Sequence, residues 1–438
     1  MTQANLARAL RLAPEAFLVA SGQAVAAAGS IVGIRVLTTL LRPAAYGEFA
    51  LALTGATLAQ QLILGPVATA CVRYYAPAVE NRTIGIYARS ILALFLIGTF
   101  VLLAISIALG LALWISGHRL LLTGLEAAFV FAWVSSASSM LDGIQNAARQ
   151  RAIVAFHQGL GAWLRLALVI VVARLYGASS GGVLWAYSAG YLLLIGSQAF
   201  FLVRTFSCVG SLADAGPARP MLVSMCRYAW PFSAWGIFTW MQSASDRWAL
   251  SAYSGLYQVG LYQSLYQIGY YPVAMLTQFL LQVCTPILFQ KAGGGGDLKR
   301  QRLAERFNNT LAAAVLLATI LGAAASYFGG HRILALLVAP EYRVRSSLIT
   351  LLILASGCFS AGQIAALNLM TSFSTRRLIA PKIVTAIAGV ALIAVGAAYS
   401  ATNGVVVAQL IFSAGYLFWI LYLNRKPFGY SLATAEVR

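Results

Sequence analysis

Long apolar stretches alternate with short polar breaks along the whole chain of 438 residues. A helix needs about 20 apolar residues to cross the hydrocarbon core of a bilayer. Twelve stretches meet this requirement, and they predict an all-α polytopic membrane protein with twelve transmembrane helices. The helices are expected at residues 14–41, 47–72, 84–115, 121–143, 152–173, 182–204, 228–251, 258–289, 305–328, 346–371, 380–399 and 404–423.

The positive charges of the breaks predict which side of the membrane each break faces. Of the 30 Lys and Arg residues, 21 lie at the termini, in every second break or at the adjoining helix ends, whereas 6 lie in the other breaks. Because short loops rich in Lys and Arg stay on the cytosolic side, both termini are expected in the cytosol. The six residues predicted outside are Arg42, Arg119, Arg174, Arg332, Arg343 and Arg345.

The composition excludes a soluble globular protein. Hydrophobic residues make up 60% of the chain and charged residues only 9%, whereas soluble domains contain about 25% charged residues. The net charge of +19 is spread over seven predicted cytosolic segments, so nucleic acid is not an expected partner. We expect the basic loops to contact anionic lipids of the cytosolic leaflet.

The cysteines and the N-terminal segment add little chemistry. Five cysteines show no CxxC motif or other metal-type spacing, so we predict no metal site, no disulfide framework and no cofactor. The first apolar run is longer than the core of a signal peptide, and it is interpreted as an uncleaved first span.

A polar break divides the chain into two halves of six predicted helices each. This break, residues 207–222, carries Gly, Pro and Ser and is interpreted as a cytosolic linker. It separates an N-terminal lobe, residues 1–206, from a C-terminal lobe, residues 223–438.

The two halves also share a local pattern. Each has an Arg near the predicted outer end of its first helix, Arg35 or Arg247, and a turn glycine 12 or 13 residues later, Gly47 or Gly260. Six helices per half, beginning on the same side, indicate a parallel repeat about an axis along the membrane normal, which is a transporter architecture.

Three segments give a more specific resemblance. GIRVLTTLLRPAAYGEF at 33–49, SDRWAL at 245–250 with the GLY that follows at 260–262, and VAPEY at 338–342 resemble the polysaccharide-transporter branch of the multidrug/oligosaccharidyl-lipid/polysaccharide flippase superfamily, the O-antigen flippase type. The resemblance covers essentially the whole chain. It implies two six-helix lobes around a central cavity that opens alternately to each side of the membrane, and transport without a catalytic residue.

Three arginines remain at membrane depth and are the first candidates for substrate binding. A charge at the bilayer centre costs about 2.5–3.5 kcal/mol on insertion scales, so Arg35, Arg165 and Arg247 are expected to face protein or water. A guanidinium binds phosphate oxygens in bidentate fashion, which favours a diphosphate ligand. In the alternative interpretation Arg35 and Arg247 are structural, and they reach the outer interface or pair with Glu48 and Asp246.

Aromatic and amide side chains follow one side of the predicted helix at 258–289. Tyr262, Tyr266 and Tyr270 are four residues apart, and Gln263 and Gln267 lie beside them. Tyr266, Gln267 and Tyr270 are candidates for a platform that contacts sugar rings, and Asp246 completes the candidate set. The alternative is an aromatic belt at the membrane surface, which explains Tyr262 better than the more deeply placed Tyr270.

Carboxylates at membrane depth are scarce. Asp142, near the inner end of its helix, is interpreted as a helix-end polar residue, with a coupling-ion site as the alternative. His157 is interpreted as structural, with a protonation sensor as the alternative. A cation-coupled antiporter is expected to carry more buried Asp and Glu, so this shortage favours an anionic substrate.

We therefore expect a flippase that moves polyprenyl-diphosphate-linked oligosaccharide across the bacterial inner membrane for surface polysaccharide assembly. Other proteins of polysaccharide assembly are expected partners. The alternatives are a cation-coupled drug or metabolite antiporter of the same fold and, from another class, a membrane glycosyltransferase or polymerase. The enzyme would need acidic catalytic residues or an extended outer loop, which this sequence does not display.

Overall fold

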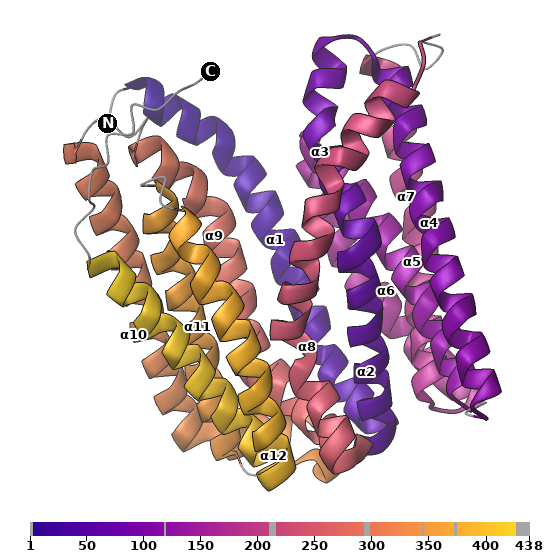
Figure 1. The fold of residues 1–438 in the computed structure, drawn as a ribbon, viewed down its shortest axis with the longest axis vertical. Helices are drawn as coiled ribbons and strands as arrows, with labels where there is room; N and C mark the ends of the chain where they lie inside the picture. Colours follow the sequence, from indigo (N-terminus) through magenta and orange to yellow (C-terminus); the bar gives the residue numbers. More distant parts are fainter. Residues whose placement is uncertain are drawn as a thin grey trace. The chain divides into compact units, whose positions relative to one another are not determined.

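The structure is a computed structural model that describes residues 3–117, 120–209, 216–292, 298–343, 346–371 and 375–425. Within these ranges the chain is all-helical, as predicted (Figure 1). The α-helices are α1 (Gln3–Leu40), α2 (Pro43–Ala59), α3 (Gly65–Glu80), α4 (Ile84–Ile115), α5 (Leu120–Ala147), α6 (Arg151–Tyr176), α7 (Ser180–Val209), α8 (Arg219–Gly269), α9 (Tyr271–Ala292), α10 (Leu298–Leu337), α11 (Ser347–Thr371) and α12 (Ile379–Arg425). A π-helix, η1 (Gln60–Leu64), joins α2 to α3, and two short 3-10 helices are η2 (Pro340–Tyr342) and η3 (Thr375–Leu378).

All twelve predicted segments are helical, and ten helices in the described ranges are long and apolar enough to cross a membrane. Helix α12 contains two predicted segments, and α8 contains one segment and the first part of the next. Non-helical backbone at Gly255 divides α8, and non-helical backbone at Ser400 and Ala401 divides α12. A polytopic helical membrane protein is thus confirmed, whereas twelve as the number of crossings stays a prediction.

The chain packs into two compact units. Unit 1 comprises residues 1–251, 255–263 and 337–342, and unit 2 comprises residues 252–254, 264–336 and 343–438. The first part of α8 is thus grouped with the N-terminal helices, whereas the predicted second lobe begins at residue 223. Because packing in one conformation need not follow the sequence repeat, the lobe boundary stays a prediction. Residues 210–215 of the predicted linker lie outside the described ranges.

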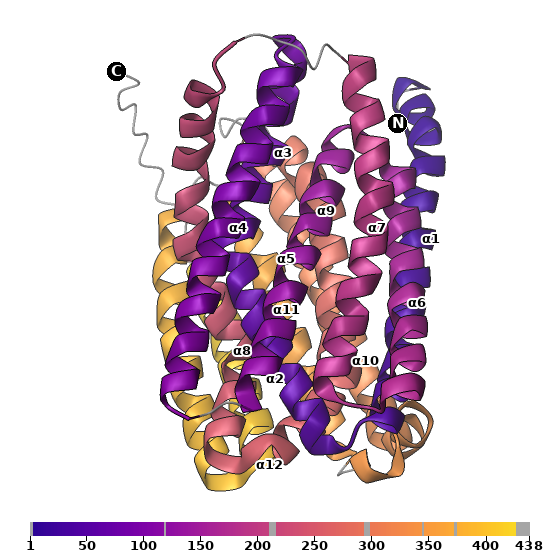
Figure 2. The same cartoon turned by 90° about the vertical axis from the view of Figure 1, so that its right-hand side faces the viewer.

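In unit 1 the other helices pack around α5 and α6. Helix α5 lies beside α3, α4 and α7, and α6 lies between α1 and α7 (Figure 2). Glycines permit the close approach of α1 to α6. A Cβ on Gly29 would lie 2.9 Å from the Cβ of Ala162, and a Cβ on Gly22 would lie 2.7 Å from the carbonyl oxygen of Ala155. The small residues thus hold α1 and α6 together, a common device of membrane helices.

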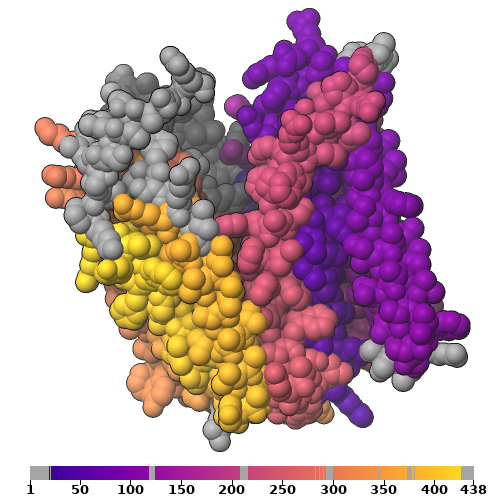
Figure 3. Space-filling view, in the orientation of Figure 1, coloured from indigo at the N-terminus to yellow at the C-terminus, as the bar shows by residue number. Residues whose placement is uncertain are grey.

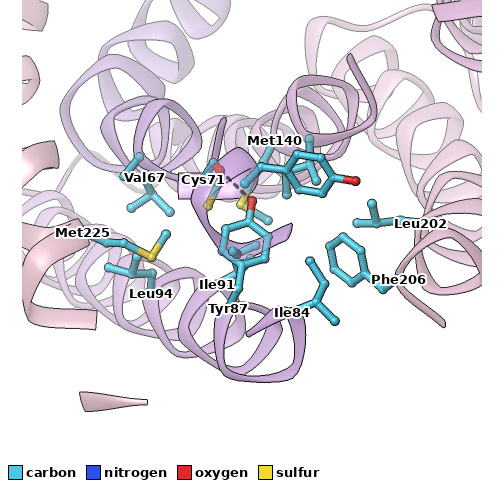
Figure 4. Close-up of a cluster of buried hydrophobic side chains, with 14 of the residues drawn as sticks. Val67, Cys71, Ile84, Tyr87, Ile91, Leu94, Met140, Leu202, Phe206 and Met225 are labelled. Carbon is cyan, nitrogen blue, oxygen red and sulfur yellow. Dashed lines mark hydrogen bonds between the residues drawn. The ribbon is translucent and has the colours of Figure 1, made fainter. Parts of the chain in front are cut away.

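A hydrophobic cluster joins α3, α4, α5, α7 and the start of α8 within unit 1 (Figure 4). The Tyr87 hydroxyl lies inside it and donates a hydrogen bond of 2.6 Å to the carbonyl oxygen of Cys71, so its polar group is satisfied. Met225 of α8 is fully buried in the same cluster. This burial explains why the first part of α8 belongs to unit 1.

Helix α4 lies at the outer face of unit 1 (Figures 1 and 3). Many of its exposed side chains are apolar. Phe100 is 71% exposed and Ile115 is 77% exposed. In water such a surface would be unfavourable, but in a bilayer it faces lipid tails of the same polarity. The exposure therefore agrees with a helix that borders lipid.

In unit 2, α11 packs against α9 and α12. Gly362 of α11 allows the ring of Tyr416 on α12 to lie close, since a Cβ there would be 2.7 Å from that ring. The Asn308 amide on α10 donates to the Asn368 side chain on α11 at 2.8 Å. Interhelical amide bonds of this kind satisfy polar groups that lipid cannot satisfy.

The predicted orientation has a direct test by cysteine labelling in a variant without native cysteines. Ser179 and Asn403 are exposed at helix ends predicted outside, and Asn81 is exposed in the turn between α3 and α4, which is predicted inside. Cysteines at Ser179 and Asn403 should react with an impermeant thiol reagent on intact cells. A cysteine at Asn81 should react only after the membrane is opened. The reverse labelling pattern would contradict the orientation derived from the charge bias.

Candidate functional site

Arg247 and Asp246 of α8 form the centre of a buried polar network in unit 1. The guanidinium Nη1 lies 2.9 Å from Asp246 Oδ1, and Nε donates to Gln263 Oε1 at 2.7 Å. Tyr262 donates from its hydroxyl to Asp246 Oδ2 at 2.6 Å, and Arg247 Nη1 also donates to the Ser243 carbonyl oxygen at 2.8 Å. The two charges thus neutralise one another and link the two parts of α8 on either side of Gly255.

The burial of this pair agrees with the structural alternative for Arg247. Both side chains are nearly inaccessible, at 5% exposure for Arg247 and 3% for Asp246. Breaking a buried pair by removing one partner leaves an uncompensated charge, which is strongly destabilising. A direct contact of Arg247 or Asp246 with substrate stays a prediction.

Arg35 lies at a second polar contact, which we name the clasp. It consists of Arg35, Thr38 and Leu41 at the end of α1, together with residues 337–342. Arg35 Nη1 donates to the carbonyl oxygen of Val338. The Ala339 amide donates to Thr38 Oγ1 at 3.2 Å, and the Tyr342 hydroxyl donates to the Leu41 carbonyl oxygen at 2.8 Å. The clasp therefore fastens the end of α1 to a segment about 300 residues away in the sequence.

A close backbone contact within unit 1 joins the second part of α8 to α2. A Cβ on Gly260 would lie 1.8 Å from the Pro43 carbonyl oxygen, and a Cβ on Gly47 would lie 2.1 Å from the Leu256 carbonyl oxygen. Only glycine fits such an approach without displacement of backbone. The repeated turn glycines of the sequence are thus in mutual contact, an arrangement that the repeat did not predict.

Arg165 of α6 differs from the other two arginines. Its guanidinium carbon lies 4.4 Å from the centroid of the Tyr191 ring on α7, a cation–π geometry. Gly161 and Gly190 leave room for the side chain, since a Cβ on Gly190 would lie 2.6 Å from Arg165 Cγ. Among the described residues Arg165 has no hydrogen-bond or ion-pair partner, and it is half-buried. Its five N–H donors are therefore available to an anion.

A row of aromatic rings in unit 1 connects Arg165 to the clasp. Neighbouring ring centroids in this row are 5.6 to 6.3 Å apart. Such separations are typical of aromatic pairs that pack in direct contact. In order, the rings are Tyr191, Phe131, Tyr187, Phe49, Tyr46 and Tyr342.

The predicted sugar platform lies in unit 2, except for Tyr262. Tyr266 and Tyr270 are stacked with ring centroids 4.7 Å apart and planes at 15°. Tyr266 and Gln267 are half-buried, whereas Tyr270 is buried where α8 ends. Tyr262 is fully buried in unit 1, and its hydroxyl is bound to Asp246. Tyr262 is therefore engaged within unit 1, and the contact of Tyr266, Gln267 and Tyr270 with sugar stays a prediction.

Several partners of the candidate residues were not predicted from the sequence. Tyr191, the partner of Arg165, belongs to no recognised motif. Its only signal in the sequence is Tyr187, four residues earlier on the same helix face. Gln263, which binds Arg247, is one of several glutamines in its segment. Val338 binds Arg35 through its backbone, so its side chain carries no signal. VAPEY was noted only for its resemblance.

The comparisons with known proteins agree with the fold. Residues 12–291 match the family model described as polysaccharide biosynthesis protein. A search of curated protein sequences found no match. Among solved structures, the lipid II flippase MurJ in an inward closed conformation shares 11% identity. The alignment covers 94% of this chain and 87% of that chain, with a TM-score of 0.68.

Two further solved transporters are also similar. A point mutant of the Vibrio cholerae MATE transporter VcmN shares 13% identity over 96% of this chain and 97% of that chain, with a TM-score of 0.65. A Pyrococcus furiosus superfamily transporter, described by the reverse polarity of its binding pocket, shares 14% identity over 94% of each chain, with a TM-score of 0.53. At these identities the likeness concerns the fold alone. The family match covers more than half of the chain, which therefore belongs to the polysaccharide biosynthesis protein family and has the fold of the multidrug/oligosaccharidyl-lipid/polysaccharide flippase superfamily, as its motifs predicted.

Proposed function

We propose that this membrane transporter is a flippase for polyprenyl-diphosphate-linked oligosaccharide. It moves this lipid from the cytosolic to the outer leaflet of the bacterial inner membrane, where surface polysaccharide is assembled. No covalent bond is made or broken. The polyprenyl chain remains in lipid while the polar head passes through the protein.

The observation that carries this proposal is the state of Arg165. It is a half-buried cation inside an apolar segment, stacked on Tyr191, and it has no carboxylate partner among the described residues. A cation at membrane depth is unfavourable unless an anion accompanies it. The diphosphate of the substrate supplies two adjacent phosphates, and the planar fork of the guanidinium matches their oxygens.

The other candidate residues receive different roles in this proposal. Arg247 and Asp246 hold the two parts of α8 in place through their buried pair. Tyr266, Gln267 and Tyr270 contact the sugar, because aromatic rings and amides bind the apolar faces and hydroxyls of sugar rings. Arg35 acts through the clasp, which closes the predicted outer side of the path until the substrate is loaded.

The proposal is tested with purified protein in liposomes. A fluorescent polyprenyl-diphosphate-linked oligosaccharide is placed in both leaflets, and its movement is measured by adding a membrane-impermeant quencher. Protein-containing liposomes should expose the inner-leaflet lipid to the quencher much faster than empty liposomes.

Two control lipids define the specificity. The same sugar on a polyprenyl monophosphate should move more slowly, because it offers fewer oxygens to the guanidinium. A phosphatidylcholine analogue with the same fluorophore should not move. Equal rates for all three lipids would indicate unspecific scrambling and would contradict the proposal. Export of cationic dyes without movement of the sugar lipid would support a drug antiporter in its place.

A further inference from the structure

A carboxylate lies inside unit 1 between two glutamine side chains. Asp142 is located on α5, five residues before the helix ends at Ala147 and within an apolar span. Its Oδ1 accepts a hydrogen bond from Gln198 Nε2 at 2.6 Å, and its Oδ2 accepts one from Gln158 Nε2 at 3.2 Å. Both oxygens are thus held by neutral amide donors that come from two other helices, α7 and α6.

The same amides connect the carboxylate to further helices. Gln158 Oε1 accepts from Gln23 Nε2 of α1 at 2.8 Å, and Gln198 Oε1 accepts from Ser138 Oγ of α5 at 3.0 Å. We name these five residues, with Asp142 at the centre, the amide cage. The amide cage joins α1, α5, α6 and α7 through four side-chain hydrogen bonds.

The charge of Asp142 has no direct counter-charge. Among the described residues the carboxylate makes no ion pair, and the basic groups that act on it are His157 and Arg165 of α6. His157 is itself bound by neutral groups, the Ile153 carbonyl oxygen at 2.8 Å and Ser197 Oγ at 3.0 Å. Helices α1 and α7 contribute only amides to the amide cage. A carboxylate in an apolar span with only neutral donors is readily neutralised by a proton.

We propose that Asp142 is a proton-binding site of this transporter, and that its charged and neutral forms hold α1, α5, α6 and α7 together differently. The proposal rests on the transport function, because it gives the transport cycle a proton to use. The charged carboxylate accepts from both amides, as described above. A protonated carboxyl has an O–H that must find an acceptor.

That acceptor is available only if a glutamine rotates its amide. Gln158 then presents Oε1 to Asp142 and releases Gln23, or Gln198 presents Oε1 and releases Ser138. Binding of one proton therefore exchanges a link between helices for a link to the carboxyl. The proton comes from water and returns to water, and no covalent bond between heavy atoms changes.

The arrangement favours a proton over a metal cation. Sodium and other hard cations require several oxygen ligands. In the amide cage both glutamines direct nitrogen toward the carboxylate, and their oxygens are occupied by Gln23 and Ser138. The site as it stands is lined by donors, which is a setting for a carboxylate that gains and loses a proton.

The experiment measures the proton on the carboxyl directly. Purified protein in lipid is titrated from neutral to acidic pH, and the infrared band of protonated carboxyls is recorded as a difference spectrum. Asp142→Asn should lose the part of the band that one carboxyl contributes. Glu126→Gln is the matched control, because Glu126 lies on the same helix but is exposed. It should leave the Asp142 part of the band in place.

A second variant serves if Asp142→Asn does not fold. Gln198→Leu removes the shorter of the two donors, so the charged form loses support and the Asp142 band should appear about one pH unit higher. His157→Gln should retain the band. If Asp142→Asn retains the full band, or if Gln198→Leu leaves its midpoint unchanged, the proposal is overturned. The same holds if sodium chloride, but not choline chloride, removes the band at constant pH.

Transport gives an independent readout. A proton gradient should accelerate movement of the sugar lipid several-fold in the wild type, and Asp142→Asn should lose this acceleration while it keeps movement without a gradient. Retained acceleration in Asp142→Asn would refute the proton site. If the wild type moves no sugar lipid but the Asp142 band titrates as described, the proposed substrate is wrong and the proton site stands.

Discussion

Arg165→Ala is expected to lower the rate at which polyprenyl-diphosphate-linked oligosaccharide crosses the membrane by about ten- to a hundredfold. A hydrogen bond to a charged group contributes about 1.5–3 kcal/mol, and each 1.36 kcal/mol of barrier changes a rate tenfold. Because the guanidinium forms no hydrogen bond or ion pair among the described residues, its removal breaks no direct polar contact, and Asp142 keeps both of its amide donors. Protein abundance and thermal stability should therefore stay close to the wild type.

The control variants distinguish the contributions of the Arg165 charge, the shape of its guanidinium and the Tyr191 ring to transport. Arg174→Ala removes an exposed arginine from the end of the same helix and should leave transport unchanged. Arg165→Lys should restore only part of the rate, since lysine keeps the charge but loses the fork. Tyr191→Phe keeps the ring under the guanidinium and should be active. Normal transport by Arg165→Ala, in a variant with normal abundance, would remove the main support for a diphosphate ligand.

Crosslinking the clasp is expected to stop transport almost completely. Alternating access requires the ends of the path to open and close in turn. In the proposed role of the clasp as a gate, residues 337–342 leave the end of α1 during each cycle. Thr38 and Ala339 are in hydrogen-bond contact at 3.2 Å. In a variant without native cysteines, a Cys pair at these two positions should form a crosslink and block transport, and reduction should restore it.

A second Cys pair controls for the effect of crosslinking itself. The hydroxyls of Ser326 on α10 and Thr350 on α11 lie 3.2 Å apart within unit 2, where no separation is expected. Cysteines at these positions should crosslink without loss of transport. If the Thr38 and Ala339 pair is fully crosslinked while transport continues, the clasp is not a gate and its role is only structural.

The apolar segments could be predicted from the sequence because a bilayer imposes one requirement on every crossing helix. Each must satisfy its own backbone and present apolar side chains over its length. The breaks within α8 and α12 were predicted as loops. In the structure each is a sharp kink, at Gly255 in α8 and at Ser400 and Ala401 in α12. A loop and a sharp kink look alike in hydropathy, since both interrupt the apolar run for only a few residues.

The partners of the candidate arginines could be predicted only where they are neighbours in the chain. Asp246 beside Arg247 was recognised as an alternative partner, and the ion pair is present. Gln263 is 16 residues away and Val338 is 303 residues from Arg35, and no local periodicity connects such positions. The amide cage of Asp142 likewise draws its glutamines from three different helices. A helix-end carboxylate and a half-buried carboxylate bridged by amides have the same sequence pattern.

The clasp has a consequence for how this protein and its relatives diverge. Each of its three hydrogen bonds has a side chain at one end and a backbone atom at the other, namely the Val338 oxygen, the Ala339 nitrogen and the Leu41 oxygen. Substitution cannot remove a backbone carbonyl, and among these positions only proline would remove the amide. Selection on these hydrogen bonds therefore acts on Arg35, Thr38 and Tyr342, whereas the side chains of Val338, Ala339 and Leu41 are constrained only by the packing in which they are buried. Comparison of sequences alone would reveal one half of the contact and conceal the other.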